Sequence, residues 1–71
     1  MSFKKTEREQ LDVIRTELAR HGVTELRVVQ RRRHKQVFWP GGSCAVSGSP
    51  SDCMGLMALR ALVRRQCRRA G

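Results

Sequence analysis

Hydrophobic residues recur every three or four positions near the start of the chain. Leu11, Ile14 and Leu18 fall within about 80° of arc on a helix of 3.6 residues per turn, and His21 extends the same stripe. This spacing is typical of an amphipathic helix that buries one face. We therefore expect the stripe to form part of the core.

The ends of this helix carry recognisable signals. Thr6 and Glu9 have the spacing of a capping box, in which the two side chains satisfy free backbone donors at the first turn. Gly22 supplies a residue that adopts the left-handed conformation that ends many helices. The predicted helix runs from about Glu7 to about His21.

The middle of the chain alternates with the period of β-structure. Residues 25–30, 36–39 and 43–47 read as three short strands, rich in residues that favour a pleated sheet. The basic run 31–35 forms the bend between the first two strands, and the Pro-Gly-Gly segment 40–42 forms the next turn.

A second helix is predicted from about residue 49 to about Arg69. Ser49 as cap and Pro50 in the first turn are typical of a helix start. One side of this helix carries no arginine, and we expect it to be the buried stripe. Apolar residues outside this stripe either widen the core or form an exposed patch for a partner. The stripe is Leu56, Leu59, Val63 and Cys67, and the residues off it are Met54, Met57 and Leu62.

The order of these elements predicts an α+β fold, α-β-β-β-α. Three antiparallel strands form one sheet, and both helices cover one face of it, which leaves the other face open. At 71 residues we expect a single small domain over 1–71, with an ordered core from about 6 to 67.

Charge is distributed unevenly along the chain. The sequence has 15 Lys and Arg against 6 Asp and Glu, a net charge of +9. Basic and acidic residues balance over residues 1–25, whereas ten Lys and Arg stand against Asp52 alone in the remainder. Such an asymmetry favours a nucleic acid as partner, and an acidic protein is the alternative.

The basic residues that we expect to bind phosphate lie in the bend and on the last helix. Five successive basic or titratable side chains in the bend repel one another, so a polyanion is the favoured reason for holding them together. The predicted nucleic-acid-binding residues are Arg31, Arg32, Arg33, Lys35, Arg60, Arg64, Arg65 and Arg68.

The remaining composition excludes several classes of site. Cys44, Cys53 and Cys67 have neither CxxC nor Cys/His spacing, which argues against a zinc site or a disulfide framework. No Gly-rich phosphate loop or catalytic triad is visible, so we expect no metal and no cofactor. No signal peptide or apolar run of membrane-spanning length is present, and a cytoplasmic protein is expected.

The two adjacent aromatic residues Phe38 and Trp39 must face opposite sides of a strand. One ring is expected in the core. The other lies on the open face, where it either stacks on a base or covers the stems of basic side chains.

The element order and the histidine-bearing bend resemble the double-stranded-RNA-binding fold, and more closely the HicA family of small bacterial toxins. The resemblance covers residues 7 to about 66 and rests on the bend 31–38 and on the helix 55–66. It implies an mRNA interferase inhibited by an antitoxin, with His34 at the position of the catalytic histidine. The family carries small residues before this histidine, where this chain has Arg32 and Arg33. Short phage and prophage proteins with a lone histidine in the bend are also similar.

Three functions therefore remain open. The first is a nucleic-acid-binding protein, with RNA favoured over DNA. The second is a metal-independent ribonuclease that uses His34 for proton transfer; the alternatives for His34 are a polar bend residue or a packing role. The third is a phage interaction protein that binds an acidic partner. The sequence does not fix the oligomeric state.

Overall fold

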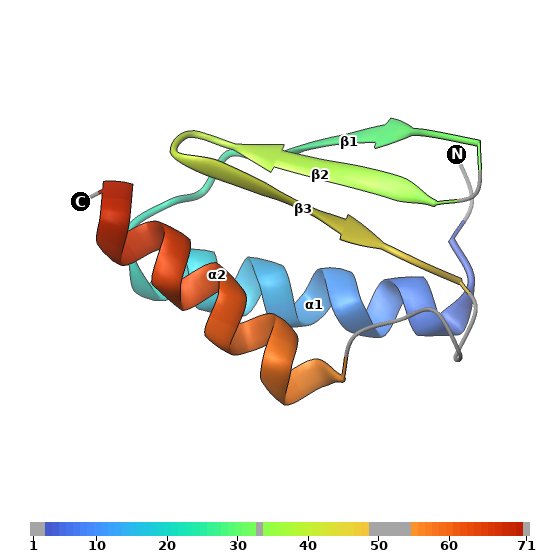
Figure 1. Cartoon of the computed structure of the whole chain (residues 1–71), viewed down its shortest axis with the longest axis horizontal. Coiled ribbons are helices and arrows are strands. Elements are labelled where there is room, and N and C mark those ends of the chain that lie inside the picture. The colour runs from blue at the N-terminus through green and yellow to red at the C-terminus, as the bar shows by residue number, and fades with distance from the viewer. Residues whose placement is uncertain (1–2, 33, 49–54, 71) are drawn as a thin grey trace.

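The chain forms two helices and three strands in the predicted order. The computed structural model describes residues 3–32, 34–48 and 55–70. The elements are α1 (Lys5–Arg20), β1 (Arg27–Gln30), β2 (Lys35–Trp39), β3 (Gly42–Val46) and α2 (Leu56–Ala70). The predicted α+β class and the α-β-β-β-α order are confirmed (Figure 1).

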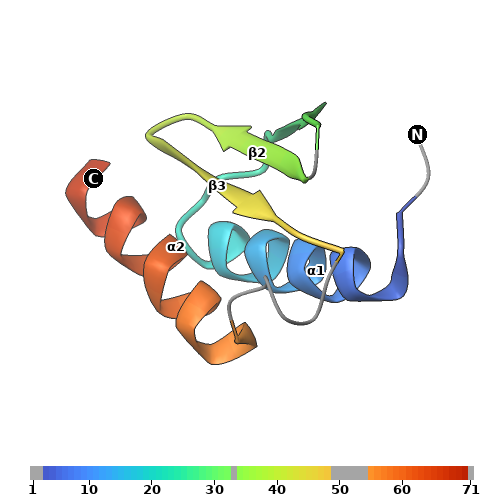
Figure 2. The same cartoon turned by 45° about the vertical axis from the view of Figure 1, so that its right-hand side comes forward.

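The strands form one antiparallel sheet in the order β1-β2-β3. Both helices lie on the same side of this sheet, and no element covers the other side (Figures 1 and 2). The turn between β2 and β3 has Pro40 at its first central position and Gly41, with φ 100°, at its second. This combination is favoured in a type II turn, because only glycine adopts the positive φ without strain.

The start of α1 differs from the predicted one. The helix begins at Lys5, and the residue preceding it, Lys4, donates its backbone N–H to Glu7 Oε1 at 2.8 Å. Thr6 lies inside the first turn, so the predicted capping box of Thr6 and Glu9 is wrong. Glu7 takes the role expected of Glu9, because the helix starts earlier and places Glu7 at its third residue.

The end of α1 follows the prediction. Gly22 adopts φ 78° directly after the helix, and its N–H donates to the carbonyl of Ala19 at 3.1 Å. The N–H of Val23 donates back to the carbonyl of Leu18 at 2.9 Å. These bonds satisfy two carbonyls that the helix end would otherwise leave free.

The hydrophobic core lies between the sheet and the two helices. Leu11, Ile14 and Leu18 of the stripe predicted on α1 are buried, whereas His21, which follows the helix, is exposed. From α2, Leu59, Val63 and Cys67 join the core. Leu56 was expected in the core but is 42% exposed, because it is the first residue of α2 and lies at its solvent-facing start. The buried hydrophobic residues are Leu11, Ile14, Leu18, Val37, Trp39, Cys44, Val46, Leu59, Val63 and Cys67.

Alternation along β2 separates the two faces of the sheet. Lys35, Val37 and Trp39 are buried toward the helices, whereas Gln36 and Phe38 are partly exposed on the open face. Of the two adjacent aromatic rings, Trp39 is therefore the core residue. The predicted helix start at 49–52, together with Arg33, Cys53 and Met54, lies outside the described residues.

Two glutamine amides cover the outer edge of β3. Gln66 of α2 accepts a hydrogen bond from the Ser43 N–H at 2.9 Å and donates to the Ser43 carbonyl at 2.8 Å. Gln10 of α1 makes the same pair of contacts with Ser47, at 3.4 and 2.7 Å. A side chain at Gly42 would collide with the Gln66 amide. Each helix is thus joined to the edge strand by an amide that imitates a neighbouring strand.

We expect Gln10→Met to lower the free energy of unfolding by about 1–3 kcal/mol, because methionine keeps the volume but leaves the Ser47 backbone groups without these partners. Glu9→Met, at the exposed neighbouring position, is the control and should change stability by less than about 0.5 kcal/mol. Urea denaturation of both variants measures the difference. Equal stability of Gln10→Met and the wild type would contradict a role for this amide.

Candidate nucleic-acid interface

The basic bend is divided between the surface and the interior. Arg31, Arg32 and His34 lie in the connection between β1 and β2, whereas Lys35 is the first residue of β2. Lys35 lies opposite Gln30 in the sheet and faces the helices, because it has the same parity as buried Val37. The run of basic residues is therefore not one continuous surface.

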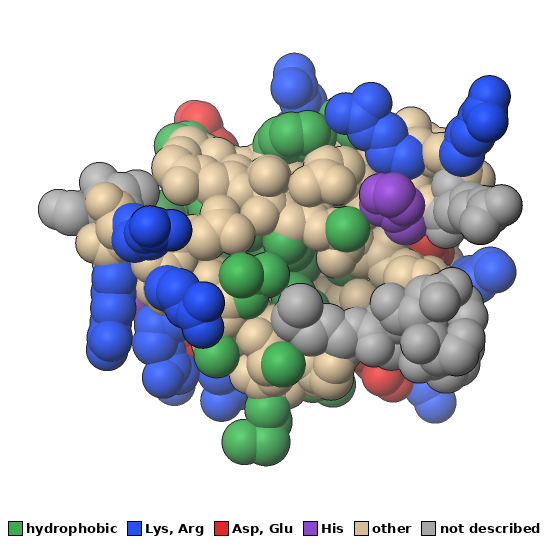
Figure 3. All heavy atoms as spheres, viewed as in Figure 1, with side chains coloured by type: hydrophobic (Ala, Val, Ile, Leu, Met, Phe, Trp, Pro, Cys, Tyr) green, Lys and Arg blue, Asp and Glu red, His purple; other side chains and the backbone are tan. Residues whose placement is uncertain are grey.

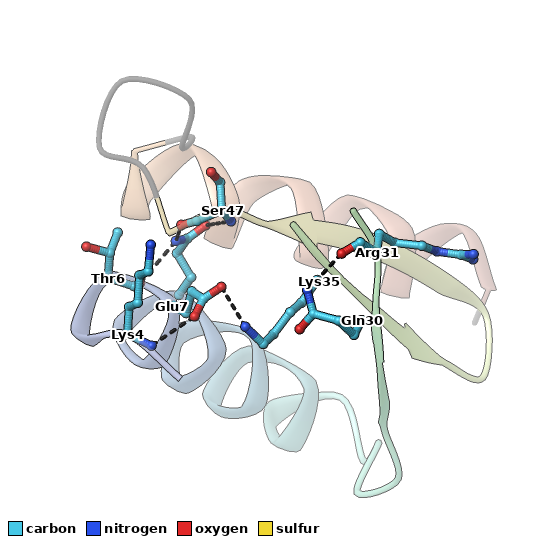
Figure 4. A network of polar contacts seen from close by, with 8 residues as sticks. Lys4, Thr6, Glu7, Gln30, Arg31, Lys35 and Ser47 are labelled. Carbon is cyan, nitrogen blue, oxygen red and sulfur yellow. Dashed lines mark hydrogen bonds and ion pairs between the residues drawn. The ribbon is translucent and has the colours of Figure 1, made fainter. Parts of the chain in front are cut away.

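The ammonium group of Lys35 binds a carboxylate inside the protein. Lys35 Nζ lies 2.9 Å from Glu7 Oε2, and the two side chains are only 8% and 6% exposed (Figure 4). The same ammonium lies 5.1 Å from the centre of the Phe3 ring. Lys35 was predicted to contact nucleic acid, but its charge is neutralised within the fold, and we leave it out of the interface.

Glu7 joins three parts of the chain. Its Oε1 accepts the Lys4 N–H, and its Oε2 accepts from Lys35 (Figure 4). The backbone hydrogen bond from Lys4 lowers the pKa of Glu7, and Lys35 lowers it further, against the opposing effect of burial. Glu7 is consequently held as a carboxylate, which pairs with the lysine charge.

His34 lies at the end of the β1–β2 hairpin and is partly buried. The N–H of Arg31 donates to the His34 carbonyl at 2.8 Å, so these two residues face each other across the hairpin. Among the described residues, no side chain forms a hydrogen bond or ion pair with the His34 ring. In the described part of the chain, no second acid or base is therefore hydrogen-bonded to His34.

Arg27 is a basic residue of the open sheet face that sequence reasoning did not assign to the site. It lies opposite Phe38 in the pairing of β1 with β2, and its guanidinium carbon lies 5.7 Å from the centre of the Phe38 ring. Phe38 thus covers a basic side chain, one of the two roles expected for the outer ring. The alternation of Arg27 with Val28 was the signal that could have placed it there.

Two arginines of α2 are drawn toward a buried carboxylate. Arg64 Nε lies 3.5 Å from Glu17 Oε2, and Arg60 Nε lies 3.8 Å from Glu17 Oε1. His21 Nε2 also contacts Glu17, at 3.2 Å. Burial raises the pKa of Glu17, but hydrogen bonds from Arg64 and His21 outweigh it, so the net pKa is lowered. Glu17 therefore neutralises part of the arginine charge where α1 meets α2.

The arginines at the end of α2 remain uncompensated. Arg65, Arg68 and Arg69 are exposed, and none of them forms an ion pair with an acid of the described segments. Arg65 and Arg69 flank a hollow of about 570 Å³ next to Gly41, with Leu62 and Gln66 as its other lining residues. We name Arg65, Arg68 and Arg69 the α2 arginine cluster. Arg69 was not assigned to the site from the sequence.

Two groups of exposed arginines lie at opposite ends of the molecule. The β1–β2 hairpin with Arg31 and Arg32 lies at one end of the long axis, and the C-terminal end of α2 lies at the other (Figure 1). In the space-filling view, Lys and Arg side chains gather toward these ends, with neutral and hydrophobic surface between them (Figure 3). The Cα atoms span 31 Å along this axis. The hairpin arginines Arg31 and Arg32 and the α2 arginine cluster therefore form two separate surfaces.

The described residues also bear on metal binding, on thiol reactivity and on membrane spanning. No group of three or more His, Cys, Asp or Glu suited to a metal ion occurs within residues 3–32, 34–48 and 55–70. Burial raises the pKa of Cys44 to about 11, and it also raises that of Cys67, so both thiols are protonated at neutral pH. No helix of the described segments is long and apolar enough to cross a membrane.

We expect Lys35→Met to lower the free energy of unfolding by about 3 kcal/mol, because the buried Glu7 carboxylate loses its counter-charge. The double variant Glu7→Gln/Lys35→Met removes both charges and should lie within about 1 kcal/mol of the wild type. Thermal or urea denaturation gives this double-mutant cycle, with exposed Lys5→Met as control. Additive losses in the double variant would show that the two side chains are not coupled.

Stability should also depend on pH through Glu7. The folded pKa of Glu7 is lowered, so the unfolded chain takes up the proton first as the pH falls. Its contribution is complete above the ordinary glutamate pKa of about 4.3 and is lost as the pH falls through the folded value. Glu17 acts in the same direction.

Urea denaturation at pH 6 and pH 3 measures this dependence for the wild type and for Glu7→Gln. The wild type should lose stability toward pH 3, and Glu7→Gln should lose less because the contribution of Glu7 is absent while that of Glu17 remains. An equal decline in both proteins would refute the assignment to Glu7.

Comparison with known proteins identifies no relative from which a function could be inferred. No family model matches the sequence, and neither a curated protein nor a solved structure is significantly similar to the chain. The resemblance to the HicA family therefore stays a hypothesis that rests on the bend, its histidine and the order of the elements.

Proposed function

We propose that this chain is a small nucleic-acid-binding protein with RNA as its main ligand. The observation that carries the proposal is the α2 arginine cluster, three exposed guanidinium groups without an acidic partner among the described residues. Guanidinium groups bind phosphate oxygens in a bidentate way, and their repulsion is relieved when a polyanion binds.

The distribution of acids supports this proposal. Two of the five described carboxylates, Glu7 and Glu17, are buried and engaged within the fold. The three exposed ones, Glu9, Asp12 and Glu25, belong to α1 and the connection that follows it. The α2 arginine cluster and the β1–β2 hairpin therefore keep their positive potential.

The separation of the two basic surfaces favours a structured RNA over a short single strand. A rigid duplex presents phosphates at distances that both ends of the protein can reach. Double-stranded RNA is recognised mainly through its shape and through phosphate and 2′-hydroxyl contacts, which suits a surface of arginines with one partly exposed phenylalanine. Sequence-specific readout is not part of the proposal.

Cleavage of RNA would need more than His34. A metal-free reaction requires a base for the 2′-hydroxyl and an acid for the leaving oxygen, and no side chain of the described residues is hydrogen-bonded to His34. Binding needs only the exposed arginines. We therefore propose binding, and RNA cleavage is an outcome that the same experiment can detect.

The double variant Arg65→Gln/Arg69→Gln should weaken binding to a 20-base-pair RNA duplex and reduce the slope of log K against log salt by about 2, one for each lost phosphate contact. Fluorescence anisotropy over a salt series measures both quantities. The control Arg8→Gln/Arg15→Gln removes the same charge from exposed positions of α1 and should leave more of the slope intact.

Two results would overturn the proposal. One is wild-type affinity that does not fall with salt. The other is an equal reduction in slope for the control and for the α2 variant, which would assign binding to net charge alone. A DNA duplex of the same length tests the RNA preference, and intact RNA recovered after incubation distinguishes binding from cleavage.

A further inference from the structure

The two outer edges of the sheet, on β1 and on β3, differ in whether their outward backbone groups have hydrogen-bond partners. At the outer edge of β3, the N–H and C=O groups of Ser43 and of Ser47, the residue after the strand, are each engaged by a glutamine amide. On β1, the Arg31 N–H points to β2, so by alternation Arg27 and Val29 also point to β2, whereas Val28 and Gln30 direct their backbone groups outward. No described residue bonds to these outward groups of Val28 and Gln30.

A hollow lies next to the start of this edge. It measures about 420 Å³ and is lined by residues of α1 and of the connection to β1, mostly through apolar atoms. Leu26 precedes β1 by one residue and has the same parity as Val28, so this hollow lies on the helix side of the sheet. Both helices bring Cα atoms within 8 Å of β3, but none of their Cα atoms comes this close to β1. The lining residues are Arg15, Leu18, Ala19, Val23, Thr24 and Leu26.

The charges around this edge are mainly positive. Arg27 and Arg31 have the parity of the open face, and Arg15 lines the hollow, whereas Glu25 before β1 and Asp12 of α1 are acidic. In the antiparallel pairing of β1 with a second copy that sets Val28 opposite Gln30, Arg27 of each copy would lie opposite Arg31 of the other, and like charges directly opposite are unfavourable.

From this geometry we infer that the β1 edge is a docking site for an extended acidic peptide of a partner protein, which adds to the sheet as a fourth strand. The peptide residues opposite Val28 and Gln30 exchange backbone hydrogen bonds with them and point to the helix side, where an apolar side chain enters the hollow. The residues opposite Arg27, Val29 and Arg31 point to the open face, where carboxylates meet arginine. The expected ligand alternates acidic and apolar residues.

This site shares Arg31 with the β1–β2 hairpin, but it includes no residue of the α2 arginine cluster, which lies on a different element. A partner bound at β1 therefore leaves the proposed RNA surface of α2 free. Failure of one proposal does not decide the other, because the Arg65→Gln/Arg69→Gln variant keeps the β1 edge unchanged.

A labelled Glu-Val-Glu-Leu-Glu peptide, with blocked ends, tests the inference on the full chain. We expect binding that slows hydrogen exchange of the Val28 and Gln30 amides. N-methylation of the two apolar peptide residues removes the donors that face β1 and should weaken binding by about tenfold or more. N-methylation of the central glutamate, whose N–H faces solvent, is the matched control and should weaken it much less.

Protein variants provide a second test. Val28→Pro removes one outward donor and keeps the bonds of β1 to β2, and proline is tolerated at such an edge position. Ala19→Glu places bulk and negative charge at the hollow, whereas Ala61→Glu makes the same change at an exposed position of α2. Val28→Pro and Ala19→Glu should each weaken the peptide, and Ala61→Glu should not.

Several outcomes would overturn the inference. These are no binding at about 1 mM peptide, equal effects of the two N-methylated peptides, and equal effects of Ala19→Glu and Ala61→Glu. Protection of Val28 and Gln30 in the protein alone, with a dimer seen by light scattering, would assign the edge to a second copy. A single-stranded RNA that protected the same two amides would assign it to nucleic acid.

Discussion

The fold depends on two carboxylates that α1 directs into the protein. Glu7 binds Lys35 of β2, and Glu17 contacts Arg64 of α2, so a single helix is tied by charge to both the sheet and the other helix. A buried carboxylate without a partner costs several kcal/mol. Each pair therefore restricts how its two elements can be arranged. A shift of β2 by one residue would turn Lys35 to the open face and leave Glu7 without a counter-charge.

The same two pairs determine the character of the surface. The chain has few acids, and two of them are withdrawn into the interior, so that the exposed arginines of α2 and of the hairpin have little to neutralise them. The side-chain amides of Gln10 and Gln66 likewise determine which backbone groups at the sheet edges already have hydrogen-bond partners. They bind the backbone groups of Ser43 and Ser47 at the β3 edge, whereas no described residue binds the outward backbone groups of Val28 and Gln30 on β1. The same placement of polar residues thus stabilises the fold and leaves the surface arginines and the β1 edge available for binding.

The sequence predicts the architecture well, because the architecture follows from short-range patterns. The apolar stripe of α1, the alternation in β2 and the stop at Gly22 are each visible within a few residues. The start of α1 was misplaced because both Glu7 and Glu9 have the spacing of a capping residue. The contact of Glu7 with Lys35 is a tertiary one, which the local sequence does not show. Leu56 was assigned to the core from periodicity alone, which does not show where a helix extends beyond the sheet.

The candidate site was less predictable for a physical reason. A run of five basic letters looks continuous, but pleating turns Lys35 inward, and only the presence of Glu7 on a distant helix makes that burial favourable. Arg27 and Arg69 were overlooked because their importance comes from neighbours across the sheet and across the β2–β3 turn. The separation of the two basic ends is likewise a property of the folded chain.

The central claim is that the α2 arginine cluster, which the fold leaves without an acidic partner among the described residues, binds phosphate. The most direct test follows the side-chain Nε–H signals of all arginines by NMR while an RNA duplex is added at physiological salt. The account predicts large changes for Arg65, Arg68 and Arg69 and smaller ones for Arg64, which stays with Glu17. Changes confined to the arginines of α1, or equal for every arginine, would contradict it.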